Sequence, residues 1–193
     1  MKLEKQNWFS ERHKVYGDIN SELIKRVETV SNILNEAFDN GGKLLVFGNG
    51  GSAAEAQHFS AELVCQFAKK RKALPAISLT TDTSIITAQG NDFGFETIFS
   101  RQIEALGIKG DVVVGFTTSD ADIEDSHSKN VILAFREARR KGLITVGFFS
   151  KKTENLLSEV DFAIIAPHTN TAIIQELHLS IIHMMCFFIE EKL

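Results

Sequence analysis

Apolar residues follow two different spacings along the chain. Between Ile19 and Phe38 they recur at steps of three and four residues, which predicts an amphipathic helix, and Gly41 and Gly42 mark its end. Five short apolar runs follow, each typical of a buried strand, at residues 43–48, 75–79, 111–116, 143–149 and 161–166. Helical patterns separate and follow these runs, at residues 52–68, 83–88, 95–106, 128–141 and 170–192.

This alternation predicts the fold class. Five apolar strands separated by helices indicate an α/β protein with a five-stranded parallel sheet flanked by helices on both faces. We expect one domain over residues 1–193, with N-terminal helices in residues 1–40 and the α/β core in residues 41–193, because no repeat or proline-rich linker divides the chain. Ligands of such sheets bind beyond the carboxyl ends of the strands, at helix N-termini.

The last predicted helix is apolar on almost every side. Its segment LHLSIIHMMCFFIEEKL, residues 177–193, suits a helix buried in an oligomer better than one on the surface of a monomer. The N-terminal helices need cover of the same kind, so we expect a homo-oligomer.

Composition and charge limit the classes of partner. Hydrophobic residues make up 44% and charged residues 24% of the chain, as in soluble proteins, and the net charge of −4 argues against a nucleic-acid partner. The one basic cluster, KKRK at residues 69–72, is expected to be a solvated helix end or loop. No window of 18 apolar residues and no signal-like start occurs, so no membrane partner is predicted. Cys65 and Cys186 lack metal spacing and are predicted to be buried thiols, which favours a cytoplasmic location.

A glycine-rich turn, GNGGS at residues 48–52, joins the first apolar strand to the next helix. Its spacing matches neither the dinucleotide-binding pattern nor a P-loop, but its backbone N–H groups can face an anion or a sugar hydroxyl. A structural alternative is a capping box between Ser52 and Glu55. His58 and Glu62 stand four residues apart and share one helix face behind this turn, which favours a functional site.

Four motifs in order carry a resemblance to a known family: GNGGSAAEAQHFSAEL, LPAISLTTDTS, GNDFGFETIFSRQIEALG and IIQELHLSIIH. With these motifs the chain resembles the phosphoheptose isomerases, a branch of the sugar isomerase (SIS) domain family. The resemblance implies a flavodoxin-like three-layer sandwich whose N-terminal helices pack in a homotetramer, with active sites at subunit junctions. It also implies conversion of sedoheptulose 7-phosphate to D-glycero-D-manno-heptose 7-phosphate for bacterial lipopolysaccharide or capsule, and a possible zinc ion, Zn²⁺.

The resemblance assigns roles to individual residues. The catalytic base is Glu62 and its acid–base partner is His183. The four positions that match zinc ligands are His58, Glu62, Gln175 and His183, although Gln175 and His183 lie about 12 Å apart along one helix and must lean toward each other. Substrate contacts are expected from Asn49, Gly50, Gly51, Ser52, Asn91, Asp92, Thr117, Thr118, Ser119, Ser128 and Gln175. His178, on another side of that helix, is expected to be structural or part of an interface, and Asp82 a helix cap.

The chain departs from the family at the phosphate loop. Where the family has STSGNS, eight residues from Asp120 to His127 separate Ser119 from Ser128, and four of the eight are acidic. Carboxylates beside a phosphate are repulsive unless they point away. Three interpretations follow: the insert loops outward, the substrate has changed, or the protein is a non-catalytic SIS-fold regulator that senses a sugar phosphate or binds a protein. A calcium loop is not predicted, because the glycine and glutamate of that motif are missing.

Overall fold

One parallel sheet forms the centre of the molecule. The computed structural model describes residues 7–121 and 128–193. The strands are β1 (Leu44–Gly48), β2 (Ala76–Ser78), β3 (Val112–Phe116), β4 (Ile144–Ser150) and β5 (Phe162–Ala166). They are all parallel and lie in the order β2-β1-β3-β4-β5. This is the flavodoxin-like strand order, so the predicted fold class is confirmed.

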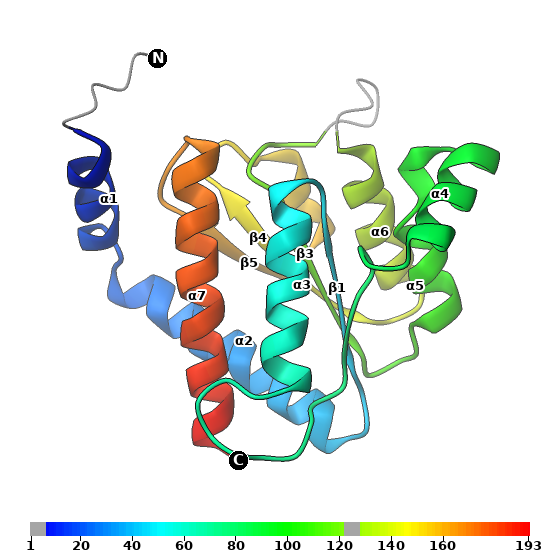
Figure 1. The fold of residues 1–193 in the computed structure, drawn as a ribbon, viewed down its shortest axis with the longest axis horizontal. Coiled ribbons are helices and arrows are strands. Elements are labelled where there is room, and N and C mark those ends of the chain that lie inside the picture. Colours follow the sequence, from blue (N-terminus) through cyan, green and yellow to red (C-terminus); the bar gives the residue numbers. More distant parts are fainter. Residues whose placement is uncertain (1–6, 122–127) are drawn as a thin grey trace.

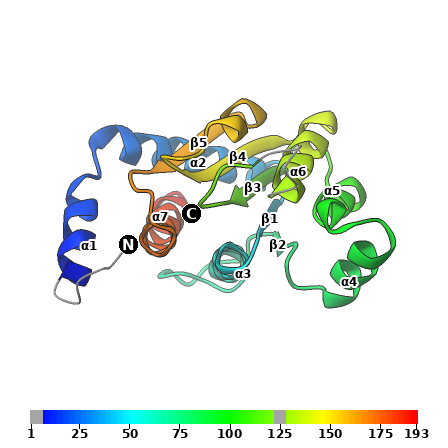
Figure 2. The ribbon, with the colours of Figure 1, turned by 90° about the horizontal axis from the view of Figure 1, so that it is seen from above.

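Helices cover both faces of the sheet (Figures 1 and 2). They are α1 (Trp8–Gly17), α2 (Ser21–Asp39), α3 (Gly51–Val64), α4 (Thr83–Asp92), α5 (Ser100–Leu106), α6 (Lys129–Arg140) and α7 (Thr171–Glu191), with short 3-10 helices η2 (Phe95–Thr97) and η3 (Asn155–Glu159). The first buried cluster joins α2, α3 and α7 to one face of the sheet, and the second joins α5 and α6 to the other.

The alternation of side chains in β1 explains the two clusters. Leu44 and Val46 point into the cluster with α3 and α7, whereas Leu45 and Phe47 point into the cluster with α5 and α6. All five residues of β1 are buried, because both faces of a central parallel strand are covered. The strand therefore carries the glycine turn to the carboxyl edge of the sheet, where α3 and α7 both begin.

Two predicted helices differ from the observed ones. The helix expected at residues 52–68 ends at Val64, because the backbone N–H groups of Phe67, Ala68 and Lys69 donate to the carboxylate of Glu190 instead of continuing the helical ladder. The helix expected at residues 95–106 is divided into η2 and α5.

The final helix α7 is apolar because it lies in the core. It is long and apolar enough to cross a membrane by length and composition alone, and half of its apolar window is buried within the chain. Its buried residues belong to the same cluster as those of α2 and α3. The core therefore accounts for the buried half of this composition.

Helix α1 is attached to the start of α7 by polar contacts. The Arg12 guanidinium donates to both carboxylate oxygens of Glu176, at 2.5 and 2.8 Å, and lies 3.7 Å from the centre of the Trp8 ring. The apolar side chains of Trp8, Phe9 and Tyr16 remain exposed. This helix therefore presents an apolar surface beside the carboxyl edge of the sheet.

A buried ion pair fixes the opposite edge of the sheet. Asp111, fully buried before β3, accepts hydrogen bonds from Nζ of Lys43 at 2.6 Å and from the backbone N–H groups of Lys43 and Ile108. Asp111→Asn should lower the free energy of unfolding by about 3 kcal/mol, because it leaves the Lys43 charge without its partner. Urea denaturation would measure this, and a loss below about 1 kcal/mol would contradict it.

Candidate active site

The glycine turn begins the site. Gly50 is the N-cap of α3 and has a φ of 56°, a conformation in which a side chain would be strained. Gly51 lies against Gln175 of α7, since a Cβ on Gly51 would come within 2.2 Å of Nε2 of Gln175. The two glycines therefore allow the turn to form and α7 to approach the start of α3. The side chain of Asn49 exchanges two hydrogen bonds of 2.9 Å with Asn130.

Three predicted side chains meet two to three turns further along these helices. Nε2 of His58 lies 3.0 Å from Oε1 of Glu62 on α3 and 3.1 Å from Nε2 of His183 on α7. One ligand atom from each of the three residues lies within 4.8 Å of the others. The side chains of His58 and Glu62 are 38% and 22% exposed, so the cluster is reachable from solvent. The structure thus brings together the predicted base, its partner and one further predicted metal ligand, His58.

The donor set of this cluster fits zinc. Two imidazole nitrogens and a carboxylate oxygen are ligands that Zn²⁺ prefers, and tetrahedral bonds of about 2.0 Å keep ligand atoms about 3.3 Å apart. The observed separations of 3.0 and 3.1 Å are close to this spacing. The cluster offers three of the four predicted ligands, and the side chain of the fourth, Gln175, lies against Gly51.

Phe67 packs on the ring of His183, and the neighbouring thiol of Cys186 stays protonated. The ring of Phe67 stacks on the imidazole of His183, with centroids 5.5 Å apart and an interplanar angle of 24°. Burial raises the pKa of the Cys186 thiol to about 12, and the charges of Glu62 and Glu190 act in the same direction. Cys186 is therefore a neutral thiol. The prediction that both cysteines are buried is wrong for Cys65, which is exposed at the end of α3.

A buried pair lies on the other side of α7. His178 is fully buried, its Nε2 lies 3.2 Å from the carbonyl oxygen of Phe149, and its Nδ1 lies 3.4 Å from Oε1 of Glu55. The structural role expected for His178 is confirmed. The proposed capping box is wrong, because α3 begins at Gly51 and the carboxylate of Glu55 faces His178 instead of the helix start.

The predicted phosphate residues lie at the carboxyl end of β3. Oγ1 of Thr117 donates to the carbonyl oxygen of Ser119 at 2.9 Å, and Oγ1 of Thr118 donates to Oγ1 of Thr171 at 3.2 Å. Ser128 is the N-cap of α6, with a left-handed φ of 53°. These residues place hydroxyl groups beside the starts of α6 and α7.

The first acidic residue of the insert points away from these hydroxyls. The carboxylate of Asp120 accepts hydrogen bonds from the backbone N–H groups of Asn155 and Leu156 at the start of η3. Ala121 is buried, and its carbonyl oxygen accepts from Nδ2 of Asn155. Residues 122–127, with the other three acidic residues, lie outside the described part of the chain.

Asn91 and Asp92 are not brought to this cluster within one chain. They are exposed at the end of α4, where Nδ2 of Asn91 donates to Oδ1 of Asp92 at 2.7 Å. In both views α4 lies at the end of the sheet away from α7 (Figures 1 and 2). Their role as substrate contacts stays a prediction. Asp82 is the N-cap of the same helix and accepts from the backbone N–H of Ile85, as expected.

Sequence patterns missed two polar residues beside the site. Asn130 is buried in the first turn of α6 and holds Asn49, and Thr171 begins α7 and holds Thr118. Single amide and hydroxyl residues at helix starts are common, so nothing in the sequence marked these two out.

Comparisons with known proteins place the chain in a family. The sequence matches the SIS domain family over residues 7–150. The phosphoheptose isomerase of Geotalea daltonii is 49% identical over 180 residues, which are 93% of this chain and 91% of that protein. That of Roseiflexus sp. is 50% identical over 158 residues, 82% of this chain and 77% of that protein. The structure of phosphoheptose isomerase GmhA from Neisseria gonorrhoeae has a TM-score of 0.85 at 36% identity and covers 95% of both chains.

The chain therefore belongs to the SIS domain family. Its similarity within that family is to phosphoheptose isomerases, as the four sequence motifs predicted.

Gly51→Ala tests the close approach of α7 to the turn. The new Cβ must displace the Gln175 amide, which is the end of a flexible side chain, so the fold should survive while the substrate KM rises about tenfold. Gly17→Ala is the matched control, because a Cβ there would meet no atom within 4 Å. Steady-state kinetics of both variants would measure this, and an unchanged KM for Gly51→Ala would contradict it.

Proposed function

We propose that the protein is a sugar-phosphate isomerase that converts sedoheptulose 7-phosphate to D-glycero-D-manno-heptose 7-phosphate, for bacterial lipopolysaccharide or capsule. The observation that carries this proposal is the convergence of Glu62 and His183 on one cluster, in a chain that is 49% identical to a phosphoheptose isomerase over 93% of its length.

The proposed reaction moves one proton between neighbouring carbons. The carboxylate of Glu62 removes the proton from C1 of the ketose, the electrons of that bond form the C1–C2 double bond, and His183 gives a proton to the C2 oxygen. The resulting enediol then gives its C1 hydroxyl proton to His183, the C1 carbonyl forms, and the electrons of the C1–C2 double bond take the proton of Glu62 at C2. Atoms balance without any further reactant, and one carboxylate and one imidazole suffice.

We propose that His58, Glu62 and His183 hold a zinc ion, with Gln175 as a further ligand by family resemblance. When bound, this ion would polarise the sugar carbonyl as a Lewis acid. His58 has a second role that does not depend on metal, because its Nε2 lies between the carboxylate of Glu62 and the ring of His183 and orients both.

The sugar and its phosphate are proposed to bind at the carboxyl edge of the sheet. Residues 49–52 offer backbone N–H groups at the positive end of α3 to the sugar hydroxyls. Thr117, Thr118, Ser119 and Ser128 offer hydroxyls to the phosphate. The carboxylate of Asp120, the first residue of the insert, faces η3. This supports an insert whose first residue does not occupy the phosphate position.

We propose that four copies of the chain, each a single domain of residues 1–193, assemble in the cytoplasm. The exposed apolar side chains support assembly: Phe9 is 80% and Phe187 of α7 is 50% exposed, and α4 has no buried residue within one chain. A neighbouring copy could then bring Asn91 and Asp92 to a site whose other residues lie on α3 and α7.

Glu62→Gln tests the base. The amide cannot take the C1 proton, so kcat should fall by roughly two orders of magnitude or more while the fold is kept. Glu104→Gln is the control, since Glu104 forms an exposed pair with Arg101. Turnover of sedoheptulose 7-phosphate would measure both, with and without added zinc. A near-normal rate for Glu62→Gln would remove Glu62 from the mechanism, and substrate binding without turnover by the intact protein would favour the non-catalytic regulator.

Light scattering coupled to size exclusion tests the assembly. The expected mass is about four times the chain mass of 21.5 kDa, because the apolar surfaces of α1, α4 and α7 need cover. A particle of 21.5 kDa would exclude the tetramer.

A further inference from the structure

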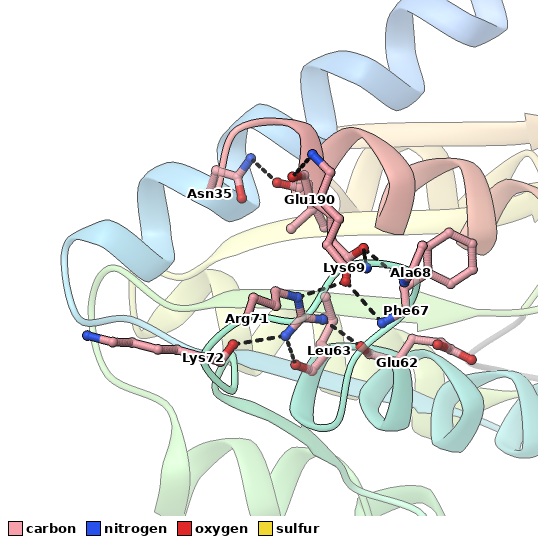
Figure 3. Close-up of polar contacts among 10 residues, drawn as sticks. Asn35, Glu62, Leu63, Phe67, Ala68, Lys69, Arg71, Lys72 and Glu190 are labelled. Atoms are coloured by element: carbon pink, nitrogen blue, oxygen red, sulfur yellow. Dashed lines mark hydrogen bonds and ion pairs between the residues drawn. The ribbon is translucent and has the colours of Figure 1, made fainter.

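A buried ion pair lies at the far end of the two helices that carry the site (Figure 3). Arg71 belongs to the loop after α3, and Glu190 stands in the last turn of α7. Nε of Arg71 donates to Oε1 of Glu190 at 2.9 Å, and their side chains are 6% and 2% exposed. The expectation that residues 69–72 form a solvated basic segment is therefore wrong for Arg71.

The Glu190 carboxylate holds the loop after α3. It accepts from the backbone N–H groups of Phe67, Ala68 and Lys69 at 3.0, 2.9 and 2.7 Å, in addition to Arg71. Burial disfavours the charged carboxylate, but these three backbone donors and the Arg71 side chain outweigh burial, so the pKa of Glu190 lies below its ordinary value. Glu190 is therefore a charged anchor for three successive peptide groups.

The Arg71 guanidinium holds the end of α3. It donates to the carbonyl oxygens of Glu62 at 2.7 Å and Leu63 at 2.8 Å. These carbonyls belong to the last turn of α3, where they have no partner within the helix. One side chain thus connects the end of α3, including the backbone of Glu62 itself, to the end of α7.

Both helices carry a reacting side chain close to this connection. Glu190 follows His183 by seven residues, which is two turns along the same face of α7. Phe67, whose N–H is held by Glu190, stacks on the His183 ring. The ion pair therefore acts on Glu62 through its carbonyl and on His183 through the Phe67 ring.

We propose that Arg71 and Glu190 are positioning residues of the isomerase site, which set the Glu62 carboxylate and the His183 imidazole relative to each other. This inference rests on the proposed function. The proposed role of the two residues is more than to stabilise the fold, because a displacement of about 1 Å in a reacting group can lower a rate about a hundredfold. The sugar and phosphate contacts at residues 49–52 and 117–119 lie at the other end of α3, so the effect should fall on kcat and leave KM nearly unchanged.

Two variants loosen the connection to different degrees. Glu190→Gln keeps the shape of the side chain but removes its charge and places an NH₂ group among N–H donors. Arg71→Lys keeps the charge but cannot reach two carbonyls and a carboxylate with a fixed fork of donors. Asp111→Asn is the matched control, because it breaks a buried ion pair of the same kind whose partners lie before β1 and β3, not on α3, α7 or the loop after α3.

Three measurements on the full-length protein decide the proposal: kcat and KM for sedoheptulose 7-phosphate, the thermal midpoint, and the NMR shift of the His183 ring protons. The Phe67 ring shifts these protons by its ring current, and His183→Gln assigns them. We expect both variants to lower kcat about 10- to 100-fold with KM within about threefold. We also expect Glu190→Gln and Arg71→Lys to lose the ring-current shift of the His183 protons. Asp111→Asn should lower the thermal midpoint but keep the wild-type kcat and the ring-current shift.

Each other outcome counts against the proposal. It is overturned if the ring-current shift is kept in both variants, if kcat stays within about twofold of the wild type, or if Asp111→Asn lowers kcat equally. Should Glu190→Gln fail to fold, Arg71→Lys alone decides. A wild-type protein without turnover would refute the proposed function instead, and the ring-current shift would then decide the positioning role by itself.

Discussion

The packing of α3 against α7 is the contact on which the site depends. Both helices follow strands of one parallel sheet on the same face, so they start at the same edge and run in the same direction. Contacts then occur in matching order along the pair. Gly51 meets Gln175, His58 meets His183, and the loop after α3 meets Glu190. A reacting pair on two rigid helices is held more precisely than a pair on loops.

Buried charges fix the starts of β1 and β3 and the ends of α3 and α7, and each charge is surrounded by hydrogen-bond partners. Asp111 accepts from two backbone N–H groups besides Lys43, and Glu190 accepts from three besides Arg71. Isolated burial of such charges would be strongly unfavourable, so the backbone donors are what make these positions tolerable. The consequence is local order in segments that carry no helix or strand, such as residues 66–72.

Sequence periodicity predicted the fold because each strand and helix follows from neighbouring residues. The five apolar runs became the five strands, and the four motifs placed Glu62 and His183 in one site. The end of α3 could not be predicted in this way, since it depends on Glu190, which is 123 residues away from Phe67 in the chain. Asn130 was missed for a related reason, because its partner Asn49 is 81 residues away.

The chain is held in place on both sides of residues 122–127. Asp120 and Ala121 are fixed to η3, and Ser128 begins α6, so the chain on both sides of residues 122–127 is anchored independently. Because the entropy of closing a loop grows only slowly with its length, extra residues between fixed anchors add little free energy. The hydroxyl residues that end β3 and the start of α6 are therefore held by contacts of their own, whatever the number of residues between Ala121 and Ser128.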